Sequence, residues 1–266
     1  MREKGDRSVM KKRRVFLLVL TLLTIAAVCY GIFSRFGFPS LTVSDGAFFF
    51  GYHSEGDKSI RKETGPFSGI DIKLKEADVC VRTGEKYSIT YRSDESLFPS
   101  YEVDKKTLVV TDPSSAKKPK GLLMVTVPKK FARLSEISVK AENGDITVAP
   151  SPSLSADKLT VSSDNGDIVM RNILGASLVA YSDNGDITAE RISFKTSDLS
   201  SENGDLIISP SDGCSAYRYH LSGGNGDIRI GDGIYQGTID SGNGLIAGDG
   251  AKDMTLEADN GDIIVK

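Results

Sequence analysis

The dipeptide Asn-Gly recurs seven times in the second half of this 266-residue chain, and this repeat constrains the fold more than any other feature. Successive asparagines lie 22, 19, 19, 22, 18 and 17 residues apart. A period of about 20 residues lies in the range of solenoid repeats. The predicted turn residues are Asn143, Gly144, Asn165, Gly166, Asn184, Gly185, Asn203, Gly204, Asn225, Gly226, Asn243, Gly244, Asn260 and Gly261.

Each unit reads as a short alternating run, then Asn-Gly, usually followed by Asp, and then a second apolar run, as in LTVSSDNGDIVM. In that unit Leu159 and Val161 alternate before the turn, and Ile168 and Met170 alternate after it, so each strand has one apolar face. Asn and Gly readily adopt positive φ, and the Asp side chain can accept hydrogen bonds from nearby backbone N–H groups. We therefore expect two strands per unit, joined by a sharp corner.

Two all-β architectures fit this pattern. A two-residue type I′ turn would give antiparallel hairpins in a sheet or sandwich. Stacked coils would give a β-solenoid (β-helix), in which near-identical units are what the packing requires. The similarity of the units favours a β-solenoid of about seven coils over residues 134–266, with an irregular β-rich entry region over 65–133.

The first 33 residues predict a single membrane crossing. Residues 1–14 hold seven Lys or Arg residues, and 15–33 form a nineteen-residue run without charge. A helix of that length spans about 28 Å, close to the hydrocarbon thickness of a bilayer. The basic flank predicts a cytoplasmic N-terminus, so the rest, beginning with a linker over 34–64, would lie outside the cell. A cleaved signal peptide and a lipoprotein signal are the alternatives, although Val28 precedes Cys29 where a lipoprotein signal needs a small residue.

One series of segments resembles a known family. It consists of an N-terminal anchor, the segments ADVCVRTGEKYSITY and VTVPKK, and then repeated NGDI or NGDL units. Over about residues 65–266 this pattern resembles the putative-adhesin family of bacterial β-solenoid proteins. The resemblance implies an envelope protein with a β-solenoid, in some members linked to envelope stress responses. It implies no catalytic residues.

The residues that usually perform catalysis form no recognisable site. His53 and His220 are isolated, and the odd count of Cys29, Cys80 and Cys214 indicates neither a disulfide framework nor a metal motif. A bridge between Cys80 and Cys214 remains an alternative. Because the repeated carboxylates occupy equivalent positions, they predict a structural row and not a cleft of unlike groups. We predict no enzyme and no cofactor.

That row is the one candidate site for a cation. If the units stack in register, the aspartates after the glycines align about 4.8 Å apart, and Leu245 interrupts them in the sixth unit. Their repulsion would be offset by backbone N–H groups, by proton uptake or by a bound cation such as calcium. The members of the row are Asp145, Asp167, Asp186, Asp205, Asp227 and Asp262.

Charge divides unevenly along the predicted exported part. Residues 34–140 hold 18 basic and 14 acidic residues, whereas 141–266 hold 8 basic and 20 acidic residues, a net charge of −12. This supports either solubility or ligand binding, in which the membrane-proximal basic part would bind anionic lipid or wall polymer and the acidic solenoid would bind a cationic ligand. We expect a single-pass cell-membrane protein whose extracellular part binds or adheres to a protein or envelope polymer. The alternative is envelope-stress sensing through a membrane partner.

Two further expectations concern partners. The chain stops at Lys266 directly after a strand, so the last coil would expose unpaired backbone groups and favour a homo-oligomer through that C-terminal edge. Nothing in the sequence indicates a nucleic-acid partner.

Overall fold

The computed structural model describes residues 38–44, 47–53, 58–93, 97–114, 120–131, 133–238 and 244–266. The chain forms two units, 1–57 and 58–266. In the first unit, β1 (Phe38–Ser44) and β2 (Ala47–His53) pair as an antiparallel hairpin. None of the described segments is a helix with the length and hydropathy that a membrane crossing requires, and the predicted span at 15–33 lies outside the described residues.

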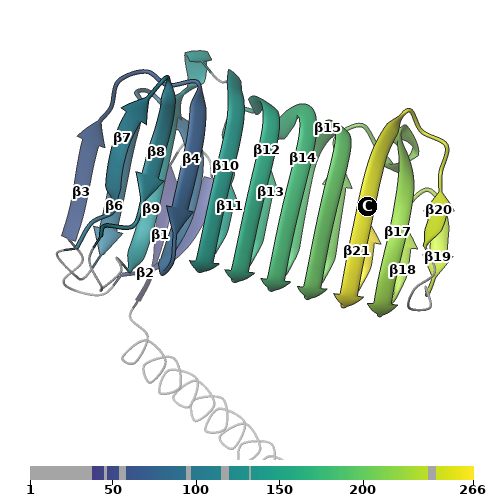
Figure 1. Ribbon diagram of the computed structural model, residues 1–266. Coiled ribbons are helices and arrows are strands. Elements are labelled where there is room, and N and C mark those ends of the chain that lie inside the picture. The colour runs from purple at the N-terminus through teal and green to yellow at the C-terminus, as the bar shows by residue number, and fades with distance from the viewer. Residues whose placement is uncertain are drawn as a thin grey trace, which may run out of the picture. The chain divides into compact units, whose positions relative to one another are not determined.

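Residues 58–266 build two sheets that face each other across an apolar core (Figure 1). The first sheet contains, in spatial order, β7 (Ser100–Asp104), β8 (Thr107–Thr111), β4 (Gly69–Leu74), β10 (Arg133–Asn143), β12 (Leu154–Asn165), β14 (Ile173–Asn184), the second half of β15 (Ile187–Asn203), β21 (Lys252–Asn260), β17 (Tyr217–Asn225) and β20 (Leu245–Ala247).

The second sheet lies behind it in Figure 1 and has the same order of coils. It contains β3 (Lys58–Glu63), β6 (Ser88–Ser93), β9 (Gly121–Pro128), β5 (Ala77–Gly84), β11 (Ile146–Val148), β13 (Ile168–Arg171), the first half of β15, β16 (Leu206–Pro210), β22 (Ile263–Val265), β18 (Ile228–Ile230) and β19 (Tyr235–Gly237). Two 3-10 turns, η1 (Lys129–Phe131) and η2 (Cys214–Ala216), occur in the connections.

Successive coils pair in parallel and in register, so the all-β prediction is confirmed and the arrangement is that of a solenoid. Asn165 pairs with Asn143 on one side and with Asn184 on the other, and Ile168 lies between Ile146 and Ile187. Each turn therefore stacks on the equivalent turn of its neighbour. Among the described residues of unit 58–266, the antiparallel pairing expected of hairpins occurs only toward the two ends of the sheets.

The coils at the C-terminal end are not stacked in chain order. The last coil, β21 and β22, lies between the coil of β15 and β16 and the coil of β17 and β18 (Figure 1). The expectation that the C-terminal strand forms an open edge is therefore wrong, because both of its sides are paired. The reason for predicting a homo-oligomer through that edge, unpaired backbone groups on the last strand, therefore does not hold.

The opposite end shows the same exchange of order. The coil of β4 and β5 lies between the coil of β8 and β9 and the coil of β10 and β11. These two early coils lack the Asn-Gly turn but continue the parallel stacking. Antiparallel strands complete both ends: β3, β6 and β7 at one end, and β19 and β20 at the other.

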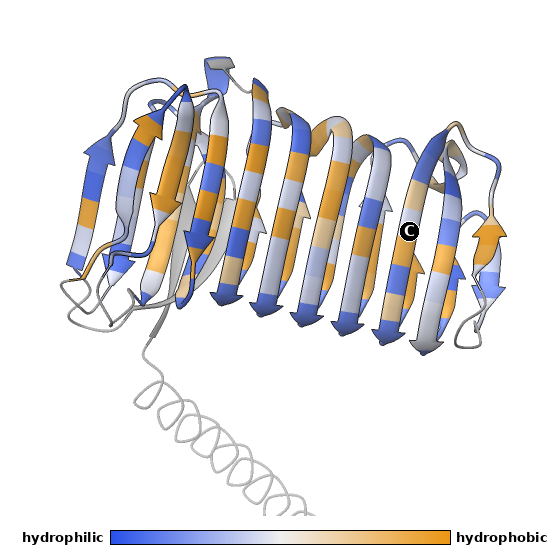
Figure 2. Cartoon of the chain, viewed as in Figure 1, coloured by the Kyte–Doolittle hydropathy of each residue, from blue (hydrophilic) through white to orange (hydrophobic). Residues whose placement is uncertain are grey.

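The core fills the space between the sheets. Leu159, Val161, Ile168 and Met170 are all fully buried, as their alternation predicts. Figure 2 shows the same alternation of apolar and polar residues along the strands of each coil. The inward residues pack between the sheets, and the outward residues are left to carry any binding surface.

Candidate binding sites

Six of the seven predicted turns form one column along an edge of the solenoid. In spatial order their asparagines are Asn143, Asn165, Asn184, Asn203, Asn260 and Asn225. Asn243 lies outside the described residues. Gly244 directly precedes β20, which runs antiparallel to β17, so the strand after this turn does not continue the parallel stack.

The asparagine side chains make a ladder. Beyond Asn143, each Nδ2 group donates to the Oδ1 atom of the asparagine in the adjacent coil, at 3.0 to 3.2 Å, whereas Asn143 donates to Glu76 Oε1 at 3.3 Å. Asn184 also donates to the carbonyl oxygen of Asp164 at 3.3 Å. The expected positive φ is wrong for these residues: each ends a strand, and none is among the described residues with positive φ. Asparagine acts here through its amide, which both donates and accepts.

Glycine is required because neighbouring coils approach closely. A Cβ atom on Gly204 would lie 2.2 Å from the carbonyl oxygen of Gly185, and one on Gly185 would lie 2.2 Å from that of Gly166. Ser201, two residues before Asn203, has a buried hydroxyl that donates to the Gly185 carbonyl at 3.1 Å. Any residue larger than glycine would clash with the backbone of the neighbouring coil at this turn.

The predicted aspartate row exists and begins one coil earlier than expected, at Asp78. Along the row, Oδ1 of each carboxylate accepts a hydrogen bond from the backbone N–H of the next aspartate, at 2.8 to 2.9 Å. Repulsion between carboxylates 4.8 Å apart is about 0.9 kcal/mol in water. A hydrogen bond to a charged group contributes about 1.5 to 3 kcal/mol. The backbone donors therefore offset the repulsion.

The geometry does not favour the bound-cation alternative for this row. Within the part of the chain that the structure describes, no group of three or more His, Cys, Asp or Glu side chains is arranged to hold a metal ion. The side chains of the row are spread along the edge, and the oxygen that each directs at its neighbour is occupied by an N–H donor.

A second series of carboxylates precedes the asparagines and makes this edge strongly acidic. Lys75 pairs with Glu142 at 2.7 Å, and Lys140 pairs with Asp164 at 3.6 Å. In a later coil the Tyr181 hydroxyl donates to Glu202 at 2.9 Å. Hydrogen bonds to Asp183 and Glu202 raise the pKa of that hydroxyl, so it stays protonated and remains a donor. The series consists of Glu142, Asp164, Asp183, Glu202 and Asp259.

Unlike groups come together on the outer face of the first sheet, in a hollow of about 420 Å³ that we call the face hollow. His220 Nε2 lies 3.7 Å from Asp253 Oδ1, and Arg218 Nε lies 4.0 Å from the same oxygen. Val179 adds an apolar surface that is 36% exposed. The hollow spans β14, β15, β21 and β17, and its lining is Ser177, Leu178, Val179, Thr196, Ser197, Asp198, His220, Asp253 and Thr255.

The sequence did not predict the face hollow. His220 and Asp253 are 33 positions apart and become neighbours only because β21 is inserted beside β17. With both carboxylates and hydroxyl groups beside an imidazole, the hollow can accept and donate hydrogen bonds, and its net charge suits a neutral or cationic ligand.

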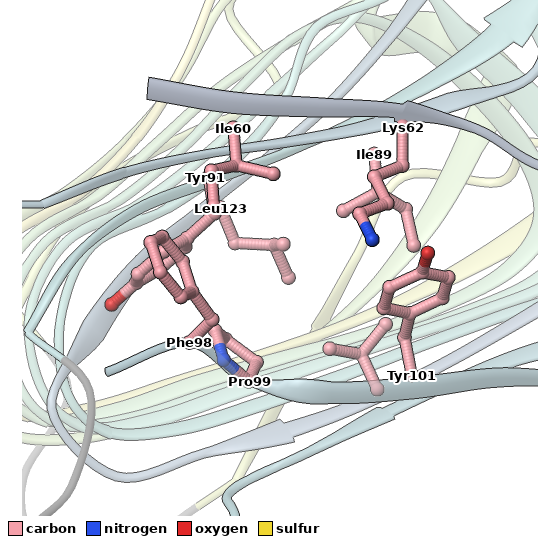
Figure 3. A pocket seen from close by; sticks show the side chains of 9 residues that line it. Ile60, Lys62, Ile89, Tyr91, Phe98, Pro99, Tyr101 and Leu123 are labelled. Atoms are coloured by element: carbon pink, nitrogen blue, oxygen red, sulfur yellow. The ribbon is translucent and has the colours of Figure 1, made fainter. Parts of the chain in front are cut away.

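A second hollow, the end pocket, lies where β3 and β6 of one sheet meet β7 and β8 of the other. It encloses about 170 Å³ and is lined by Ile60, Lys62, Ile89, Tyr91, Phe98, Pro99, Tyr101, Val110 and Leu123. Figure 3 shows the Lys62 amine and the Tyr101 hydroxyl on one side of it, with Phe98 and Pro99 on the other. The rings of Tyr91 and Phe98 meet edge to face, with centroids 5.6 Å apart.

The remaining candidate residues do not form a reactive site in the described part of the chain. Cys80 and Cys214 are free and buried, so the alternative of a bridge between them is wrong. Burial raises the pKa of the Cys80 thiol to about 11 and also raises that of Cys214, which keeps both protonated at neutral pH. Cys29 and the side chain of His53 lie outside the described residues.

With the stacked coils and their turns established, the family can be assigned. The family model "Toastrack DUF4097" matches residues 67–266. The chain belongs to the Toastrack DUF4097 family. The predicted membership of a putative-adhesin family is thereby confirmed.

Solved structures similar to this Toastrack protein include two that are described as adhesion proteins. A putative cell adhesion protein from Clostridium sporogenes is 15% identical, with a TM-score of 0.46, and the match covers 79% of this chain and 99% of that one. A putative adhesin from Bacteroides fragilis is 17% identical, with a TM-score of 0.45, and the match covers 80% and 98%. No curated protein sequence matches this one.

Proposed function

We propose that this Toastrack protein is a membrane-anchored, non-enzymatic binding module on the outside of a bacterial cell, which holds an extended polymer across the outer face of its first sheet. The observation that carries this proposal is the face hollow, where four adjacent coils contribute different polar groups to one concave surface. The seven basic residues and the nineteen-residue uncharged run at the N-terminus support the anchor.

An extended ligand fits this surface because the solenoid repeats its outward positions coil after coil. Thr196 pairs with Asp253 and Asp198 pairs with Thr255 across neighbouring strands, so hydroxyl and carboxylate groups alternate over the hollow. Hydroxyl-rich or amine-bearing polymers are recognised by such groups, and Val179 offers a small apolar contact. The net charge of −12 over residues 141–266 favours ligands that carry positive charge.

The proposal is tested by measuring how the exported part, residues 34–266, binds purified cell-wall polymers and cationic peptides. Asp253→Asn removes one charge from the face hollow, and Asp186→Asn removes one charge from the acidic edge. Losing a hydrogen bond to a charged group costs about 1.5 kcal/mol or more, so we expect Asp253→Asn to weaken binding at least about tenfold. Asp186→Asn should leave it unchanged. Equal effects of both changes would mean that only net charge matters, and the face hollow would not be the site.

Crosslinking in intact cells separates this function from envelope-stress regulation. A binding module should crosslink through the face hollow to glycan or to foreign surfaces. A single membrane protein captured at that position would favour the regulatory alternative.

A further inference from the structure

The end pocket has a chemistry that the proposed polymer-binding face does not use. Eight of its nine lining residues are apolar or aromatic, and Lys62 is the only charged one. Ile60 is 39% exposed and Tyr101 is 41% exposed, so the apolar walls continue to the surface. An apolar space with a single cation at its wall suits an amphiphile that has an apolar chain and an anionic head group.

We propose that the end pocket binds the acyl chain of an anionic phospholipid from the membrane in which the protein is anchored. This inference rests on the anchoring part of the proposed function. It assigns to this end of the solenoid a role in holding the domain against the bilayer surface.

The size of the pocket limits what enters it. A volume of about 170 Å³ is similar to that of an engineered apolar cavity of about 150 Å³ that binds benzene. The pocket therefore takes a short portion of one acyl chain and not a whole lipid. The edge-to-face pair of Tyr91 and Phe98 forms one wall of this space and Leu123 adds to it.

Charge favours an anionic lipid over a neutral one. Lys62 lies on β3, which also carries Lys58 and Arg61, and every residue of this strand is exposed. Basic groups next to a membrane surface are attracted to anionic head groups. The Tyr101 hydroxyl, on the same side of the pocket as Lys62, adds a polar group suited to the boundary between head group and chain.

The length of the intervening chain keeps the pocket near the bilayer. Only residues 34–57 separate the predicted span from Lys58, the first residue of β3. A stretch of about 24 residues cannot exceed about 80 Å even when it is fully extended, and the paired strands β1 and β2 within it shorten that reach. Membrane lipid is therefore present at a high effective concentration, which makes it a better candidate than a ligand from solution.

The experiment uses the full chain in liposomes that contain phosphatidylglycerol with a photoreactive diazirine at the end of one acyl chain. After irradiation, the crosslinked residues are mapped by mass spectrometry. We expect adducts in two places: in residues 15–33, from the span, and on the lining residues of the end pocket. Lys62→Met, or matched phosphatidylcholine, should reduce the pocket adducts about fivefold and leave those of the span unchanged.

Two substitutions separate pocket binding from general membrane proximity. Tyr101→Glu and, independently, Ile60→Glu place a charge at the wall and should abolish the pocket adducts. Ile246→Glu at the opposite end, where the residue is 64% exposed, is the matched control and should change nothing. Pocket adducts that survive both Tyr101→Glu and Ile60→Glu would overturn the inference.

The two sets of adducts also separate this inference from the proposed anchor. Adducts in 15–33 without adducts in the pocket would overturn lipid binding and leave a second copy or an apolar segment of this chain as the occupants to test. Pocket adducts without any in 15–33 would support the pocket and refute the anchor.

Discussion

Replacing Gly204 by alanine should destabilise the solenoid at its centre. Gly204 lies between Gly185 and Gly261 in the turn column. The added Cβ atom would lie 2.2 Å from the Gly185 carbonyl oxygen, whereas ordinary contacts begin near 3.4 Å. The obstacle is the backbone of Gly185 and Asp186, so no side-chain rotation can relieve it. Either the two coils separate locally or the turn changes its conformation.

The cost follows from the contacts that such a separation breaks. The Gly185 N–H donates to the Asn203 carbonyl at 3.0 Å, and the Asp205 N–H donates to Asp186 Oδ1 at 2.8 Å. Each bond contributes about 1 kcal/mol or somewhat more, and forcing an extra carbon into a packed site costs about 1 to 3 kcal/mol. We expect Gly204→Ala to lower the free energy of unfolding by about 3 to 5 kcal/mol.

Urea denaturation of residues 34–266, followed by circular dichroism, measures this loss. Gly65→Ala is the matched control, because a Cβ atom there has nothing within 4 Å, and it should change stability by less than about 0.5 kcal/mol. Hydrogen exchange of the backbone amides should show loss of protection centred on the turns of β14, β15 and β21. If both variants unfold at the same urea concentration, close approach of the coils is not the reason for glycine in this motif.

Three further predictions address the ladder, an ion pair and the thiols. Asn184→Ala removes an amide that both donates and accepts in the column, and it should cost about 1 to 3 kcal/mol in the same urea assay. Lys252→Met removes the hydrogen bond that lowers the pKa of Asp212 below 3.8, so it should cost up to about 1 kcal/mol at pH 7. The ion pair of Lys252 and Asp212 stabilises the fold above pH 3.8, and this stabilisation is lost as pH falls through the lowered pKa of Asp212. Below that pKa, the melting temperatures of Lys252→Met and wild type should therefore be equal. Cys80 and Cys214 should resist a thiol reagent at pH 8 in the native protein and react fully in urea, as mass spectrometry would show.

The fold class was predictable because each repeat unit shows the same alternation of apolar residues around the same turn. Alternation around Asn165 identified the inward residues Leu159 and Ile168, and both are fully buried. Six of the seven predicted Asn-Gly turns form the column, but the reason given for asparagine, positive φ, was wrong. A preference for positive φ is a property of one residue, whereas the amide ladder arises between coils and cannot be deduced from a single turn.

Sequence could not predict the order of the coils. The ladder neighbours Asn203 and Asn260 are 57 residues apart, and Asn260 and Asn225 are 35 apart, while the repeat suggests about 20. Because every unit has nearly the same strands and turn, several stacking orders satisfy the same pairing rules. The two early coils could not be recognised from the repeat, because they lack its Asn-Gly dipeptide. Asp78, for example, joins the aspartate row without any Asn-Gly beside it.

The face hollow depends on the insertion of the last coil, β21 and β22, between its two neighbours. Asp253 comes from β21, while Asp198 and His220 come from the strands on its two sides. In this structure β21 is the parallel neighbour of β17, and β22 is that of β18. The face hollow therefore has its observed lining only when β21 occupies its place between β15 and β17.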